Sequence, residues 1–161
     1  MQLKLICVGK MKAGPERDLL DRYADRIRKL APQLGMSWSG ISEVPESRAP
    51  DGKTRKTQEA TALNAHVKAD RAVIIVLDER GDSLDSTRWA SLIDRHREAG
   101  ASELIVMIGG PDGLDSQLRG RADKCISFGN QTMPHQLVRI IATEQLYRVL
   151  TILNGHPYHR Q

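Results

Sequence analysis

The stretch that decides the fold runs from Phe128 to Arg148 and reads FGNQTMPHQLVRIIATEQLYR. It changes character at Pro134. A polar loop that contains Gly129 comes before this proline, and a run without Gly or Pro, long enough for about five turns of helix, comes after it. A loop that leads into a helix N-terminus is a suitable place to hold a ligand. We therefore take this loop and the start of the helix as the first candidate site.

Apolar side chains surround the predicted helix after Pro134 instead of forming one stripe. They are Leu137, Val138, Ile140, Ile141, Ala142, Leu146, Val149, Leu150, Ile152 and Leu153. A chain of this size can cover one side of such a helix with its own sheet. The remaining sides favour a subunit interface over a purely internal core helix. Among the polar exceptions, Glu144 and Arg148 have the favourable order for an i,i+4 ion pair.

Composition bounds the rest of the interpretation. The chain has 161 residues, of which 40% are hydrophobic and 27% charged, so we expect one globular domain over residues 1–161. No apolar run approaches the length of a membrane span. The first residues read QLKLICVG, which is typical of a strand and not of a signal peptide. We expect a cytoplasmic protein without a membrane segment.

The two cysteines and the charges narrow the possible partners. Cys7 and Cys125 are far apart in the sequence, and neither belongs to a CxxC or Cys/His cluster, so we expect buried thiols, no disulfide and no metal. The net charge of +4 is concentrated in residues 124–161, where four basic residues oppose Glu144 alone. This mild basic bias is weak support for a nucleic-acid partner, and it fits phosphate contacts near the ligand loop.

Periodicity along the chain predicts alternating strands and helices. We expect strands at 3–8, 36–44, 72–77, 103–108 and 125–128, and helices at 16–31, 57–68, 86–99 and 116–122. The runs at 72–77 and 103–108 are almost continuously apolar, which is typical of parallel strands buried on both faces. A turn is expected at 79–82. The segment 45–57 is rich in Pro, Gly and charge, and we interpret it as a mobile solvated loop, with an RNA-contacting loop as the alternative.

Three segments at predicted strand ends are candidates for a ligand pocket. Ligands of open parallel sheets collect outside the carboxyl ends of the strands. Here these ends are Leu77-Asp78, Gly109-Gly110 and the loop 129–133, and we expect them to converge. The run IGGPDG at 108–113 lacks the Lys-Ser/Thr of a P-loop and the spacing of a GxGxxG motif. Taken alone, it is equally consistent with a simple turn after a strand.

Four segments in order resemble one known family. They are IGGPDG at 108–113, TMPHQLVR at 132–139, EQLYR at 144–148 and NGHPYHR at 154–160. Together they are similar to the RlmH family, the ribosomal large-subunit pseudouridine N3-methyltransferases of the SPOUT superfamily. The match extends over essentially the whole chain, including the start at 3–9, and all four segments in this order are highly specific.

The resemblance implies a fold and an activity that periodicity does not. It implies an α/β parallel sheet whose C-terminal part forms a trefoil knot, in contrast to the usual unknotted chain. It implies a homodimer that binds S-adenosylmethionine in the knot. The substrate would be a pseudouridine in helix 69 of 23S rRNA, methylated on the assembled 70S ribosome. This implied homodimer agrees with the interface expected from the apolar helix.

The resemblance also assigns candidate site residues. The cofactor would be bound mainly through backbone groups and apolar cover by Leu77, Gly109, Gly110, Gly129, Asn130, Gln131, Thr132, Met133 and Pro134. The protein must hold the base nitrogen in line with the methyl group and help to remove the N3 proton. Positioning is the larger of these two contributions.

The candidate catalytic residues are Tyr158, His159, His135 and Arg139. Tyr158 would stack on an extruded base, while Arg139 and Arg160 hold phosphates. His159 and His135 are the candidates for proton handling because imidazole titrates near neutral pH. For His135 a hydrogen-bonding role at the helix end is equally consistent with its position.

The C-terminal tail has two interpretations. A frayed polar tail is common at chain ends, but the dense Pro-Tyr-His-Arg ending favours function. We therefore also expect Arg160, His156 and Arg148 to contact RNA.

Two other functions are considered. A non-catalytic ribosome-binding factor on the same fold would bind particles without a cofactor. A nucleotide-binding enzyme of Rossmann type would bind a phosphate-bearing cofactor such as ATP or NAD. Binding of S-adenosylmethionine distinguishes the methyltransferase from both.

Overall fold

Five parallel strands form one sheet in the computed structural model, which describes residues 1–159. The strands are β1 (Gln2–Val8), β2 (Ser37–Val44), β3 (Ala72–Ser83), β4 (Glu103–Ile108) and β5 (Lys124–Ser127). Their order across the sheet is β2-β1-β4-β3-β5, and all pairings are parallel. Every residue of β4 is buried, which explains its continuous apolar sequence. The predicted α/β class is confirmed.

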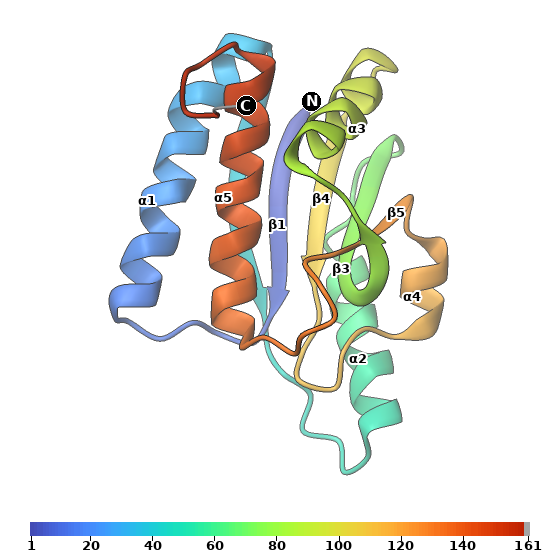
Figure 1. Cartoon of the computed structure of the whole chain (residues 1–161). Helices are drawn as coiled ribbons and strands as arrows, with labels where there is room; N and C mark the ends of the chain where they lie inside the picture. The colour runs from blue at the N-terminus through green and yellow to red at the C-terminus, as the bar shows by residue number, and fades with distance from the viewer. Residues whose placement is uncertain (160–161) are drawn as a thin grey trace.

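Helices cover both faces of the sheet (Figure 1). They are α1 (Pro15–Leu30), α2 (Gly52–Asn64), α3 (Ser86–Glu98), α4 (Ser116–Arg121) and α5 (His135–Leu153), with a short 3-10 helix at Ala31–Leu34. Helices α1, α3 and α5 lie over one face, and α2 and α4 lie over the other. Within residues 1–159, no helix has the length and apolar character needed to cross a membrane.

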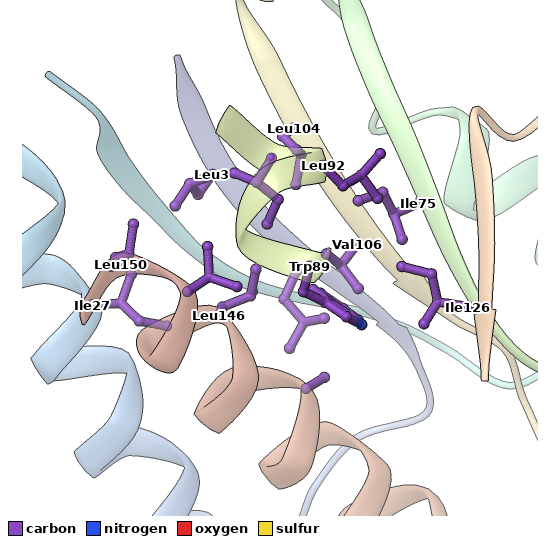
Figure 2. Packing of buried hydrophobic residues seen from close by; sticks show 14 of the residues in the cluster. Leu3, Ile27, Ile75, Trp89, Leu92, Leu104, Val106, Ile126, Leu146 and Leu150 are labelled. Carbon is purple, nitrogen blue, oxygen red and sulfur yellow. The ribbon is translucent and has the colours of Figure 1, made fainter. Parts of the chain in front are cut away.

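The larger core lies between the sheet and the α1, α3 and α5 layer. Figure 2 shows Trp89 and Leu92 of α3 and Leu146 of α5 directed at strand residues such as Val106 and Ile126. Trp89 is 1% exposed, and its ring stacks on Phe128 at a centroid distance of 6.1 Å. Burial of each large apolar side chain contributes about 1.5–3 kcal/mol. This core therefore fixes the end of β5, from which the loop 128–134 departs.

Most of the surface of helix α5 is buried by other elements of its own chain. Figure 1 shows it between α1 and the strands, and it also packs against α3. Leu146, Val149 and Leu150 are buried, whereas Leu137 is 47% exposed. The expectation that only the sheet side would be covered is therefore wrong, because two neighbouring helices cover its flanks. The outer surface that remains is near the N-terminal end of the helix.

Two predicted boundaries are corrected by the structure. Helix α2 begins at Gly52, and not at residue 57, because the Asp51 side chain caps it by accepting a hydrogen bond from Thr54 N at 2.8 Å. Strand β3 does not end in a turn at 79–82. Its register shifts between Leu77 and Asp82, and the strand then pairs again with β5.

Gly81 allows this second pairing. A Cβ at Gly81 would lie 2.6 Å from backbone atoms of Ile126, so only glycine fits there.

Candidate functional site

A pocket of about 300 Å³ opens at the carboxyl ends of the strands. Its walls come from residues 77–80 at the register shift of β3, the loop after β4, the loop after β5 and the first turn of α5. The lining residues are Lys56, Leu77, Asp78, Glu79, Arg80, Ile108, Gly109, Gly110, Pro111, Asp112, Gly113, Leu114, Arg119, Ile126, Phe128, Gly129, Gln131, Thr132, Met133, His135 and Val138. The predicted convergence of the three strand-end loops is therefore confirmed, and the pocket is within the size range of small-molecule sites.

The structure brings most of the residues expected to bind a cofactor to this pocket. Leu77, Gly109, Gly110, Gly129, Gln131, Thr132 and Met133 line it. Asn130 and Pro134 do not line it. Asn130 is exposed on the same loop, and Pro134 is the exposed residue that immediately precedes α5.

The glycines after β4 form a wall in which neighbouring side chains approach the backbone closely. A Cβ at Gly109 would meet Leu114 at 3.0 Å, and a Cβ at Gly110 would lie 2.7 Å from Glu59 Oε2. Glu59 is 4% exposed, and its Oε1 accepts a hydrogen bond from Ser47 N at 3.0 Å. Burial raises the pKa of Glu59, and the Asp112 and Glu46 carboxylates raise it further. Gly110 is therefore enclosed between the pocket and a buried carboxyl group.

The N-terminus of α5 forms the opposite wall. His135 lies in the first helical turn, where backbone N–H groups have no partner within the helix and the helix dipole is positive. Its imidazole is half-buried and lines the pocket. Burial lowers the pKa of His135, and the neighbouring Arg139 charge lowers it further. The imidazole is therefore neutral at physiological pH and can accept a proton.

Ion pairs brace the pocket on the side away from α5. Arg119 Nη1 lies 3.2 Å from Asp78 Oδ2, at the point where the register of β3 shifts. Arg55 forms two hydrogen bonds with Asp112, from Nε at 2.6 Å and from Nη2 at 2.9 Å. Arg55 and Lys56 were not predicted as pocket residues, because they fall in the segment interpreted as a mobile loop. No short-range pattern could link Arg55 to Asp112, which lies in a distant part of the sequence.

Arg139 does not occupy the phosphate-binding position that was expected. Its side chain is 3% exposed, and Nη2 donates to the carbonyl oxygens of Val8 and Gly9, to the latter at 3.0 Å. Nη1 donates to Glu43 Oε1 at 3.2 Å. Arg139 thus joins α5 to the ends of β1 and β2. These contacts hold the start of α5 against the sheet and leave the guanidinium inaccessible to a phosphate.

The C-terminal tail folds back on α1 and α5, away from the pocket (Figure 1). The Tyr158 hydroxyl donates to Glu144 Oε1 at 3.0 Å, and its ring meets Tyr147 edge-on at 4.9 Å. Glu144 stands farther along α5 than His135 by a rise of about 13 Å. Within one chain, the structure therefore does not bring Tyr158 and the adjacent His159 to His135.

The remaining candidates for RNA contact have different placements. Arg148 Nη2 pairs with Glu144 Oε1 at 2.5 Å, as the i,i+4 order predicted, and its guanidinium lies over the Tyr158 ring. His156 is exposed, and its Nδ1 accepts from Tyr158 N at 3.2 Å. Arg160 lies outside the described residues. Of the two that the structure describes, Arg148 is half-buried and His156 is exposed.

Comparison with known proteins assigns the chain to a family. A family model described as "Predicted SPOUT methyltransferase" matches residues 1–159. The chain belongs to the SPOUT methyltransferase family.

Within this SPOUT family, the chain is similar over its full length to proteins named "Ribosomal RNA large subunit methyltransferase H". The protein of that name from Brucella anthropi is 51% identical over 161 residues, which is 99% of both chains. The one from Allorhizobium ampelinum is 47% identical over 160 residues, again 99% of both chains. The resemblance to the RlmH branch of the SPOUT methyltransferases is thus confirmed.

Solved structures share the SPOUT fold at low sequence identity. A probable methyltransferase from Bordetella pertussis aligns with a TM-score of 0.54 and 15% identity, covering 92% of this chain and 95% of its own. A probable methylase family protein from Haemophilus influenzae aligns with a TM-score of 0.55 and 10% identity, covering 99% of this chain and 70% of its own. At these identities the comparison bears on the fold alone.

Proposed function

We propose that this chain transfers a methyl group from S-adenosylmethionine to N3 of a pseudouridine in helix 69 of 23S rRNA, on the assembled 70S ribosome. The observation that carries the proposal is the convergence of the glycine wall, the loop 129–133 and the N-terminus of α5 on one pocket. The full-length relatives named as large-subunit rRNA methyltransferases support the RNA substrate. The pseudouridine, its N3 atom and helix 69 follow from the RlmH resemblance.

The lining of the pocket suits S-adenosylmethionine. Leu77, Ile108, Phe128 and Val138 offer apolar cover for an adenine ring, and the glycine backbone offers polar groups without side chains in the way. When bound, this cofactor supplies an activated methyl group on a sulfonium. The braced Asp78 carboxylate places negative charge in the same cavity. The predicted set from Leu77 to Pro134 is proposed as the binding set, with Asp78 and Val138 added.

His135 is the pocket residue best placed to handle the N3 proton. Its imidazole lines the cavity and is neutral, so it can take up a proton as the new N–C bond forms. The positive end of α5 beside it stabilises negative charge that develops on the base. Arg139 acts on the reaction only as a positioning residue, because its contacts fix the start of α5.

A homodimer is part of the proposal. The two large apolar side chains that remain exposed among the described residues are Leu19 on α1 and Leu137 on α5, and these helices lie side by side (Figure 1). A second protomer packed on this surface would cover both. Because Tyr158 and His159 lie away from their own pocket, their catalytic roles require the tail of one protomer to meet the pocket of the other. Light scattering at micromolar concentration tests the dimer, and a monomer would contradict it.

Three further statements belong to the same proposal. We infer one SPOUT domain over residues 1–161, a trefoil knot in its C-terminal part and a cytoplasmic location with the ribosome. The knot follows from the RlmH resemblance, and the location follows from the proposed substrate.

Two measurements test the proposal. Calorimetry should detect binding of S-adenosylmethionine and its demethylated product but not of ATP or NAD, and preferential binding of NAD would overturn the cofactor assignment. Labelled methyl transfer to 70S ribosomes, 50S subunits and naked 23S rRNA should then give label on the RNA. The full-length chain should transfer methyl and a variant truncated after Asn154 should not. Cofactor binding without transfer to any of the three would contradict the proposed substrate.

A further inference from the structure

The segment 45–57, which its sequence suggested to be a mobile solvated loop, is fixed to the pocket wall. Arg55 is held by two hydrogen bonds to Asp112, on the loop after β4, and its Nη1 also donates to the carbonyl oxygen of Ala49 at 2.9 Å. Ser47 N donates to the buried Glu59 carboxylate. Because these contacts hold the segment before any ligand arrives, little ordering entropy opposes binding at its surface.

Three basic side chains on this segment remain available. Arg48 and Lys53 are exposed, and Lys56 is half-buried at the edge of the pocket. Among residues 1–159, none of the three forms an ion pair. Lys53 and Lys56 are three positions apart on α2, so they share one face of the helix. We call Arg48, Lys53 and Lys56 the basic rim.

Two carboxylates near the basic rim are engaged by other groups. Asp51 caps α2 through Thr54 N, and Asp112 is occupied by Arg55. Glu46 is exposed, its Oε1 lies 2.6 Å from the position of a Cβ on Gly9, and among the described residues it forms no ion pair with the basic rim. Asp51 and Asp112 therefore already have partners other than the basic rim.

The position of the rim determines what it would meet. The loop before α2 and the first turns of that helix project beyond the carboxyl ends of the strands, on the side where the pocket opens (Figure 1). An RNA that delivers a base into the pocket must pass this projection. Phosphates are the part of RNA that cations bind without regard to sequence.

We propose that the basic rim of Arg48, Lys53 and Lys56 binds the RNA backbone phosphates that flank the target nucleotide. This inference rests on the proposed function. It replaces Arg139, which is buried, as the phosphate-binding group. It also assigns a role to the segment for which sequence left two interpretations open.

The test compares ribosome binding by the native chain and three variants of the full chain. The rim variant carries R48Q, K53Q and K56Q. A control variant carries K29Q, K68Q and R95Q. These substitutions remove three exposed charges near the N-terminal ends of strands β2, β3 and β4, which is the end of the sheet opposite to the pocket. A double variant R48Q/K53Q leaves the pocket lining intact, and calorimetry with S-adenosylmethionine shows that its pocket still binds the cofactor.

Binding to 70S ribosomes and to naked 23S rRNA is measured over a series of salt concentrations. For the rim variant, the slope of log K against log salt should fall by about 2–3 relative to the native chain, because each lost phosphate contact removes about 0.7–0.9. The double variant should lose about two thirds of that amount, and the control should match the native chain.

Several results would overturn the inference. One is an equal slope for the native chain and the rim variant, and another is a loss of affinity without a change in slope. A third is a loss of affinity for 70S ribosomes but not for naked rRNA, which would indicate a protein contact. Absence of native binding to both at low salt would also overturn it. Native binding without methyl transfer would instead count against the proposed reaction and leave the slope comparison valid.

Discussion

The Glu59 carboxylate packs against the backbone of Gly110, so that a Cβ at this glycine would lie 2.7 Å from Glu59 Oε2. Glu59 cannot retreat easily, because it is 4% exposed and its other oxygen accepts from Ser47 N. One buried carboxyl group thus holds two walls of the site, the glycine loop after β4 and the segment that carries the basic rim.

Gly110→Ala should damage the pocket. The added methyl group must displace Glu59, at a cost of about 1–3 kcal/mol in the free energy of unfolding. Affinity for S-adenosylmethionine should fall by about tenfold or more, since the glycine wall moves. Urea unfolding and calorimetry measure the two effects.

Gly120→Ala is the matched control for this change. Apart from its chain neighbours and the backbone of its own helix, no atom lies within 4 Å of a Cβ at Gly120, so stability should stay equal or rise slightly. The added substitution Glu59→Ala should relieve part of the Gly110→Ala defect. Full additivity of the two changes would contradict the contact.

Arg139→Met should lower the free energy of unfolding by about 3 kcal/mol, because it removes one partner from a buried hydrogen-bonded ion pair. The loss should lie at the low end of the usual range, since Arg17 still pairs with Glu43 at 3.0 Å. Arg148→Met, on the same helix, removes a partly exposed i,i+4 pair and should cost less than about 1 kcal/mol. Equal stability of Arg139→Met and the native chain would restore the phosphate-binding role.

His135 should make the stability of the protein depend on pH in one direction. Its pKa is lowered in the folded state, so below the ordinary value of about 6.5 the unfolded chain binds more protons than the folded chain. The native chain should therefore lose stability relative to His135→Gln as pH falls through 6.5, and the difference should be constant above about pH 7.5. Urea unfolding of both forms between pH 5 and 8.5 gives this difference. If the native chain instead gained stability relative to His135→Gln at low pH, the pKa of His135 would be raised and not lowered in the folded state.

Tyr158→Phe should loosen the tail. Burial raises the pKa of Tyr158, as do the neighbouring Tyr23 hydroxyl and Glu144 carboxylate, so the hydroxyl keeps its proton and continues to donate to Glu144. Loss of this hydrogen bond to a carboxylate should increase hydrogen exchange in residues 155–159 by about tenfold. Tyr147→Phe keeps its ring packing and has no hydroxyl hydrogen bond among the described residues, so it should leave the exchange unchanged. Equal hydrogen exchange of residues 155–159 in Tyr158→Phe and Tyr147→Phe would indicate that ring packing alone holds the tail.

The fold was largely predictable because its signals are local. The apolar runs of β3 and β4, and the change at Pro134, identify elements without reference to distant residues. The same logic located the pocket, since parallel strands bring their carboxyl ends together. The predictions that failed concerned residues whose contacts are distant in the sequence. Arg139 is buried because its guanidinium donates to the carbonyl oxygens of Val8 and Gly9. Strand β3 continues past Leu77 because Gly81 fits against the backbone of Ile126.

Two further predictions were wrong: the mobility of segment 45–57 and the exposure of the sides of α5 that do not face the sheet. Charge and proline suggested mobility, but Arg55 and Asp112 meet across the fold and fix the segment. The apolar character of α5 suggested uncovered sides, but α1 and α3 fill two of them. In both cases the missing information was which distant element packs against the segment. Side-chain pattern alone does not contain that information.

The most direct measurement is nucleoside mass spectrometry of 23S rRNA from 70S ribosomes incubated with the native chain and labelled S-adenosylmethionine. The account predicts label in a single nucleoside, N3-methylpseudouridine, within the helix 69 fragment, and strongly reduced label with Gly110→Ala. Label on another nucleoside, or on another atom of the pseudouridine, would contradict it.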